Sequence, residues 1–417
     1  MVLRTVLVLT VSAGALLWAQ AVEEQLDLDE LVAEALAYNP EIRAAQKRYE
    51  ASRQRSSQES SLPDPVATIG YASSGNPLPL AGIGQAPSAN AGAMLMQELP
   101  FPAKLKLRGQ IAAKESAAIL EDYHAVQLDV VARVKQAYYK LAYARQASEA
   151  LRRNRDLLGR LLEVAEARYA VGKAGQQDVL KAQTELSILE TRLIQLQQEI
   201  AVSEAEINSL LNRHPQTPLG HPTSTEPKQL TLTLEELSEA ARRNAPLLLR
   251  EQRMVERSQQ ALNLARKDFY PDLILNGGYY DMGRMPSMYE FSVGLKLPIF
   301  AWRKQRAKVN EERALLQAAG KSYEAAAQEL AFKLKEDYSA ASAAYKLMEL
   351  YRKTVVPQAS LALESSLAAY ETGAVDFLTV LSNFSRVLEY EVNYYEAVRN
   401  YGAALARLEA LTGRRLT

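Results

Sequence analysis

The chain has 417 residues, with 49 Lys+Arg, 49 Asp+Glu and a formal net charge of zero. This balance argues against a nucleic-acid-binding protein, because such proteins usually carry a basic excess. The absence of cysteine excludes disulfides, thiolate metal sites, a cysteine nucleophile and a lipidated N-terminal cysteine.

The first 21 residues have the pattern of a signal peptide. Arg4 provides a short basic region, an apolar run covers residues 6–17, and residues 19–21 are Ala-Gln-Ala. This order predicts export, with cleavage near Ala21. An N-terminal anchor helix is the alternative interpretation. No later stretch approaches the roughly 18 apolar residues of a transmembrane helix.

The rest of the chain is predicted to be a duplication. Residues 22–213 form the first repeat, a Pro-rich connector covers 214–231, and residues 232–417 form the second repeat. LDELVAEALAYNPEI near the start of the first repeat matches LEELSEAARRNAPLL near the start of the second. Each repeat is predicted to run short helix, helix, strand, strand, very long helix, turn and long helix.

Four strands are predicted, at 66–73, 91–99, 273–281 and 288–297. The last alternates between an apolar face and a polar or small one, and its predicted lipid-facing residues are Tyr289, Phe291, Val293 and Leu295. Four strands cannot close a membrane barrel, and an open edge in lipid leaves backbone groups unsatisfied. The pattern therefore predicts that several chains share one barrel.

The predicted long helices cover 102–169 and 302–370, and Pro357 is expected to kink the second. The helix after the first turn has apolar residues at coiled-coil spacing from Val179 to Leu210. Transferring this pattern by 201 positions predicts a second row that includes Val380, Asn383, Val387, Tyr390 and Tyr394.

The two helix-to-helix turns have similar sequences. YAVGKAGQQDVL begins at Tyr169 and YETGAVDFLTVL begins at Tyr370. Gly172 and Gly373 lie three residues after these tyrosines, where each long helix must end. Glycine readily takes the left-handed conformation there, so both are predicted to be helix-terminating glycines.

These features together resemble the TolC-like outer membrane efflux proteins, over residues 22–417. The resemblance rests on the signal peptide, the duplicated element order, the LVAEALAYNP opening and the YAVGKAGQQDVLKAQ turn. It implies a mainly α fold with a small β part: a homotrimer with duplicated helical hairpins in an α-barrel and four strands per chain in a 12-stranded transmembrane β-barrel. The protein would be the exit duct of a tripartite efflux pump, in the outer membrane and extending into the periplasm. Its partners would be a periplasmic adaptor, an inner-membrane transporter and outer-membrane lipid, with no cofactor and no nucleic acid.

The resemblance also assigns roles to the two turns, as the periplasmic tips that meet the adaptor. The residues assigned to docking are Tyr169, Gly172, Asp178, Tyr370 and Gly373. Asp376, with Thr379 and Ser382, is placed at the aperture, where three chains would form an acidic ring. The alternative is that Asp376 caps a helix, because Asp is favoured at that position.

The cargo is left open between metal ions and drug-like or other organic compounds. Residues 94–109 and 285–311 resemble the heavy-metal branch of the family, and methionines gather near the predicted strands: Met94, Met96, Met282, Met285 and Met288. Thioethers suit Cu(I) or Ag(I), but methionine also fills irregular apolar interfaces, so no metal site is assigned.

An enzyme is not expected, because no H-E-x-x-H, G-x-S-x-G, Walker A or G-x-G-x-x-G motif is present. The alternatives to an efflux duct are a type I secretion outer-membrane channel and a soluble periplasmic coiled-coil scaffold or adaptor.

Overall fold

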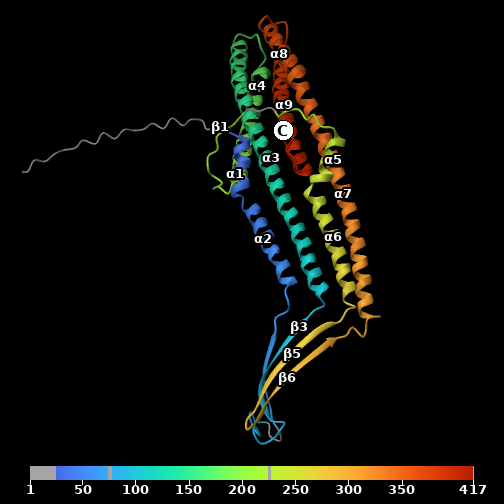
Figure 1. Cartoon of the computed structure of the whole chain (residues 1–417). Helices are drawn as coiled ribbons and strands as arrows, with labels where there is room; N and C mark the ends of the chain where they lie inside the picture. The colour runs from blue at the N-terminus through green and yellow to red at the C-terminus, as the bar shows by residue number, and fades with distance from the viewer. Residues whose placement is uncertain (1–24, 74–77, 224–226, 417) are drawn as a thin grey trace, which may run out of the picture.

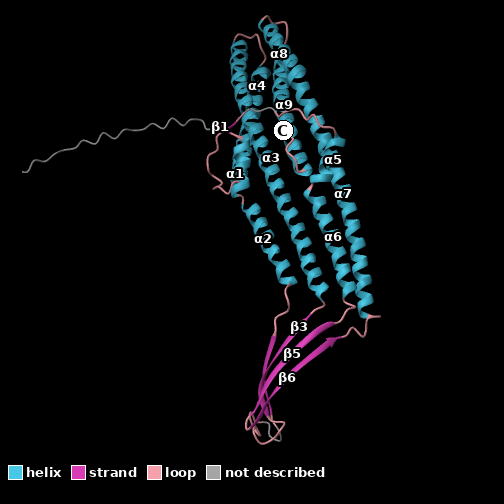
Figure 2. Cartoon of the chain, in the orientation of Figure 1, coloured by secondary structure: helices cyan, strands magenta, loops and turns pink. Residues whose placement is uncertain are grey.

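The computed structural model describes residues 25–73, 78–223 and 227–416. The expected signal peptide lies outside the described residues. The molecule is elongated: strands occupy one end, helical hairpins reach the other, and parallel helices lie between (Figures 1 and 2). No helix among the described residues is long and apolar enough to span a bilayer.

The same order of elements occurs twice. The first set is α1 (Leu28–Tyr38), α2 (Pro40–Ser60), β2 (Val66–Ala72), β3 (Asn90–Leu99), α3 (Pro102–Ala170) and α4 (Gln176–Leu210). The second set is α5 (Leu234–Asn244), α6 (Pro246–Lys267), β5 (Asp272–Met282), β6 (Met285–Lys296), α7 (Lys304–Leu350), α8 (Val356–Glu371) and α9 (Phe377–Thr412). A short parallel pair, β1 (Gln25–Leu26) with β4 (His221–Pro222), ties the N-terminal segment to the connector.

Both strand pairs join one antiparallel sheet in the order β2-β3-β5-β6. The helices keep this order, because α2 packs on α3, α3 on α6, and α6 on α7. Each strand therefore continues into the helix layer beside the same neighbours. This leaves β2 and β6 as the edge strands of the sheet.

One of the two long helices is continuous and the other is interrupted. α3 is continuous over 69 residues, about 100 Å at the α-helical rise. Its counterpart is interrupted by a π-helical turn, Tyr351–Val355, immediately before Pro357. Proline lacks an N–H and crowds the carbonyl four residues earlier, and the wider turn accommodates it. This π-helical turn lies directly before the proline at which a kink is predicted.

The apolar row predicted for α4 is confirmed, with Leu189 and Leu193 in the core. The row transferred to α9 is wrong in its middle part. Phe384 is buried there instead of Asn383, while Tyr390 and Tyr394 are only half-buried. α4 packs mainly on α3, whereas α9 packs on α3, α7 and α8. Contact with several neighbours selects a broader and rotated apolar face on α9.

Contacts between α3 and α9 hold the two repeats together. Lys135 and Glu409 form a buried ion pair across this interface. A Cβ at Gly402 would lie 2.5 Å from the Tyr139 ring, so the helices approach at a point where only glycine fits. Removing one partner of a buried ion pair leaves an uncompensated charge, so this contact fixes which residues face each other.

Candidate functional site

The strand register places apolar side chains from all four strands on one face of the sheet. Tyr289 lies opposite Tyr279, which lies opposite Ala93, which lies opposite Ile69. The expected lipid-facing residues belong to this face, and they are exposed by 79% at Tyr289, 75% at Phe291, 56% at Val293 and 58% at Leu295. We call this face, with these residues, the apolar face.

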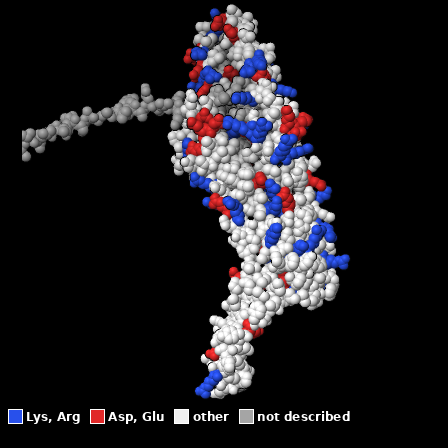
Figure 3. Space-filling model, in the orientation of Figure 1, with Lys and Arg blue, Asp and Glu red and all other residues white. Residues whose placement is uncertain are grey.

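The opposite face is polar or small in its middle part. Asn276 donates a hydrogen bond to Ser292 across β5 and β6, at 3.2 Å. Met94 and Met96 belong to this face, because they pair with Gly278 and Asn276. Charged side chains are sparse over the strand end of the molecule and frequent over the helices, on the side seen in Figure 3. The sheet is thus amphipathic from face to face, as a wall between lipid and a polar lumen must be.

The far end of the molecule carries the two helix-to-helix turns. Gly172 has φ of 70° and Gly373 has φ of 76°, so the left-handed conformation predicted for both is confirmed. In each turn the residue after the glycine donates its N–H to the carbonyl five residues earlier, Lys173 to Arg168 and Ala374 to Ala369. This is the Schellman arrangement, which satisfies carbonyls at a helix end.

The two tip tyrosines lie in different environments. Tyr169 is 48% exposed, whereas Tyr370 is 5% exposed and packs edge-on against Phe377 at 5.8 Å. The Arg168 guanidinium lies 4.2 Å from the Tyr370 ring centroid and donates a hydrogen bond to the carbonyl of Glu371 at 2.9 Å. Tyr370 therefore contributes packing, while Tyr169 is available to a partner.

The predicted aperture residues lie at the start of α9. Asp376 is the N-cap and accepts a hydrogen bond from the Thr379 backbone N–H at 2.9 Å and another from the Thr379 hydroxyl. These hydrogen bonds lower the pKa of Asp376 from its ordinary value. Ser382 is exposed on the next turn. Asp178 lies in the first turn of α4, where a carboxylate is favourable for the helix dipole.

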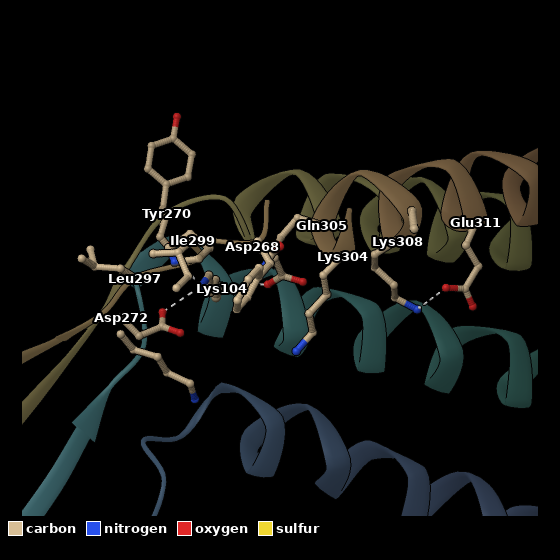
Figure 4. A pocket seen from close by; sticks show the side chains of 14 residues that line it. Lys104, Asp268, Tyr270, Asp272, Leu297, Ile299, Lys304, Gln305, Lys308 and Glu311 are labelled. Carbon is tan, nitrogen blue, oxygen red and sulfur yellow. Dashed lines mark hydrogen bonds and ion pairs between the residues drawn. The ribbon is translucent and has the colours of Figure 1, made fainter. Parts of the chain in front are cut away.

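A cavity of about 830 Å³ lies where the strands meet the helices (Figure 4). Lys104 at the start of α3 is almost fully buried there and donates to Asp272 at 2.8 Å and to the Tyr270 carbonyl at 2.9 Å. Lys304 and Lys308 of α7 point into the same space. The Lys104–Asp272 contact joins the two repeats at the base of the sheet.

Sequence reasoning missed Arg168 and Phe377. Aligning the two turns with an offset of 201 positions would have identified both. Arg168 corresponds to Ala369 in the second turn, and Phe377 corresponds to Gln176 in the first. Residues that differ between otherwise matching turns mark the contacts that one tip has and the other lacks. No group of three or more His, Asp and Glu side chains able to hold a metal is found in the part of the chain that the structure describes.

A two-faced sheet at one end and paired helical hairpins at the other define an outer-membrane efflux channel that extends into the periplasm. The chain belongs to the Outer membrane efflux protein family, whose model matches residues 31–213 and 237–414. Members of this family are transport proteins of tripartite pumps, not enzymes, and TolC-like channels are trimers that work with other pump components.

Relatives and solved structures agree with this assignment. The chain is 23% identical over 299 residues to the cobalt-zinc-cadmium resistance protein CzcC of Cupriavidus metallidurans, covering 69% of each chain. It is 22% identical over 314 residues to the outer membrane protein TolC of Vibrio cholerae, covering 72% of each. A crystal structure of CusC superposes with a TM-score of 0.81 at 16% identity, covering 94% of this chain and 93% of that one. The open-state structure of the MtrE outer membrane channel of Neisseria gonorrhoeae gives 0.77 at 19% identity, covering 94% and 89%.

Proposed function

We propose that three copies of this chain form the outer-membrane exit duct of an efflux pump, after signal-peptide cleavage near Ala21. Each copy contributes its two repeats, 22–213 and 232–417, on either side of the connector 214–231. The observation that carries the proposal is the sheet: its edge strands β2 and β6 have no further strand partner among the described residues. Pairing β6 of one copy with β2 of the next removes every edge, as lipid requires.

The apolar face is assigned to lipid and the opposite face to the lumen. Val293 and Ser292 are adjacent in β6 and belong to opposite faces. Val293→Arg should cost about 2–4 kcal/mol near the bilayer midplane, while Ser292→Arg should mainly change conductance. Trimer yield in detergent and single-channel recordings in planar bilayers measure both effects. Equal loss of trimer in the two variants would overturn the assignment.

The two turns are proposed to form the periplasmic mouth and to meet the adaptor. The α3–α4 and α8–α9 turns lie at the end of the molecule remote from the sheet (Figure 1). They contain Tyr169, Gly172, Asp178 and Gly373 or adjoin them, and the exposed ones among these residues offer contact surface. Crosslinking from Tyr169 to a periplasmic adaptor tests docking. If three Asp376 carboxylates ring the aperture, Asp376→Ala must change conductance or cation selectivity. Unchanged selectivity would leave Asp376 as a helix cap only.

A metal ion is the cargo we favour, because the curated relative CzcC is named for cobalt, zinc and cadmium resistance. Met94 and Met96 lie on the face assigned to the lumen. Organic compounds are the second candidate, and a type I secretion channel is the third. Metal sensitivity of a deletion strain, compared with its drug sensitivity and its secretion of protein substrates, separates the three.

A further inference from the structure

The segment between β6 and α7 exposes large apolar side chains and is followed by several cations. Ile299, Phe300 and Trp302 are exposed by 61%, 63% and 70%, and the Phe300 and Trp302 rings meet edge-on at 6.1 Å. Residues 299–310 contain the cations Arg303, Lys304, Arg306 and Lys308 and no acidic residue. We call residues 299–306 the collar segment. It joins three bulky apolar side chains to a cation-only stretch.

The cations of this stretch are divided between two faces of α7. Lys304, Lys308 and Glu311 line the cavity at the strand–helix junction, on the side to which Asp272 and Lys296 also belong (Figure 4). Arg306 comes two residues after Lys304, roughly 200° further round the helix at 3.6 residues per turn. Arg306 therefore lies on the side of α7 away from this cavity, and it is not among the residues that line it.

Arg303 and Arg306 are exposed, and neither guanidinium has an ion pair or side-chain hydrogen bond within the described residues. Three other cations of the junction are paired: Lys104 contacts Asp272, Lys296 contacts Glu98, and Lys308 contacts Glu312. Two unpaired guanidinium groups thus belong to the same short stretch as the exposed Phe300 and Trp302 rings, directly after the last strand of the sheet. A guanidinium matches the geometry of phosphate oxygens, and aromatic rings favour the boundary between hydrocarbon and headgroups.

We propose that the collar segment binds the headgroup of an anionic phospholipid in the periplasmic leaflet. Arg303 and Arg306 contact the phosphate, and Trp302 enters the adjacent acyl region; the exposed parts of Ile299 and Phe300, which also line the cavity, lie next to it. The periplasmic leaflet follows from the fold, since the collar segment lies at the end of the sheet from which the helices leave (Figure 2). The first repeat has a similar cation-only stretch, Lys104 to Arg108, at the same level. The proposal rests on the assignment of the apolar face to lipid.

The chain provides its own probe for a test. It contains two tryptophans, Trp18 and Trp302. Trp18 belongs to the signal peptide that is proposed to be removed, so in the processed protein all tryptophan fluorescence reports on Trp302 in the collar segment. The trimer is reconstituted into phosphatidylcholine vesicles that contain brominated phosphatidylglycerol or, in parallel, brominated phosphatidylcholine. Quenching then gives the relative affinity of the two lipids next to Trp302.

The expected result is preferential quenching by phosphatidylglycerol. Arg303→Gln and Arg306→Gln should each lower this preference about fivefold, the effect of one cation near an anionic surface. The matched control is Lys335→Gln, because Lys335 is an exposed residue of the same helix, about 44 Å further along it than Arg306. It should leave the preference unchanged. Exchanging chloride for inorganic phosphate at equal ionic strength should also leave it unchanged.

Equal quenching by both lipids in the parent protein, or a preference unchanged in the double Arg303→Gln, Arg306→Gln variant, would overturn the proposal. The proposal would also be overturned if inorganic phosphate abolished the preference for phosphatidylglycerol, because the site would then bind free anions. Absence of quenching by either lipid would also overturn it, because no lipid would then reach Trp302. Failure of the channel assignment is distinguishable, because the protein would then not float with the vesicles as a trimer at all.

Discussion

The two tips of this molecule share a backbone and differ in their side-chain environments. Both contain a glycine with positive φ and the same Schellman hydrogen bond. Yet Tyr169 of the first tip is about half exposed, and Tyr370 at the matching place of the second tip is buried. The two turns therefore share one backbone geometry, while their side-chain contacts differ.

Three substitutions between the repeats account for the difference. Phe377, which is 1% exposed and packs on Tyr370, stands where the first repeat has the exposed Gln176. Arg168 reaches from the first tip to the second, whereas Ala369 has no side chain to reach back. Asp376 caps α9 with its carboxylate, while Gly175 caps α4 without a side-chain hydrogen bond. The second tip is anchored by these contacts, and the first is left with exposed surface.

The largest expected effect comes from removing the buried ring. Tyr370→Ala should destabilise the second tip by about 3–5 kcal/mol, because it leaves a cavity between Phe377 and the core. Tyr169→Ala should change stability little, because its ring is about half exposed. Hydrogen exchange over residues 363–388, compared with residues 161–189, measures both.

Tyr370→Phe is the control for this comparison. The Tyr370 hydroxyl is buried and has no hydrogen-bond partner within the described residues, so its removal should be neutral or stabilising. A marked loss of exchange protection in Tyr370→Phe would instead show that another subunit supplies a hydrogen-bond partner for the Tyr370 hydroxyl. Equal effects of alanine at positions 169 and 370 would contradict the asymmetry itself.

The next effect should be equal at both tips. A Cβ at Gly172 or Gly373 would meet no atom within 4 Å, so only backbone strain opposes substitution. Gly172→Val and Gly373→Val should each cost about 1–2 kcal/mol, and asparagine, which tolerates this conformation, should cost less. Trimers should still form, with altered adaptor crosslinking and conductance. Normal docking and gating in both valine variants would contradict the assignment of the two turns to the periplasmic mouth.

A smaller effect is expected from the contact that links the tips. Arg168→Ala removes a cation–π contact and a hydrogen bond at a half-buried site, at a cost of about 1 kcal/mol. The loss should appear in the second tip, although the substitution is in the first. Arg168→Lys, which keeps the charge, should restore part of the protection. Increased exchange confined to the first tip would contradict this link.

The smallest effect concerns the pH response of the cap. The hydrogen bonds from Thr379 lower the pKa of Asp376 in the folded protein, so their stabilising contribution is present above the ordinary aspartate pKa of about 3.9. It is lost as the pH falls below that value and through the lowered pKa. Acid should therefore loosen the start of α9 in the parent protein, and Asp376→Ala should remove this response. The start of α4 lacks such a cap, because Gly175 has no titrating side chain.

Local physical chemistry determined much of this protein from its sequence. The doubled order of elements, the end of each long helix at Gly172 and Gly373, the break before Pro357 and the alternation in β6 all depend on nearby residues. Strand bounds were also predicted to within one to three residues, since alternation and turn residues are local signals. The family assignment followed because these local signals recur in a specific order.

Only the tertiary structure decided which equivalent residues are buried. The choice of Phe384 over Asn383 in α9, the burial of Tyr370 and the contact of Arg168 with the second tip all depend on helices distant in sequence. The union of two hairpins in one sheet, with β3 beside β5, has the same origin. A repeat fixes the local backbone in both copies, but burial is set by the neighbours that pack against it, and those neighbours differ between α4 and α9.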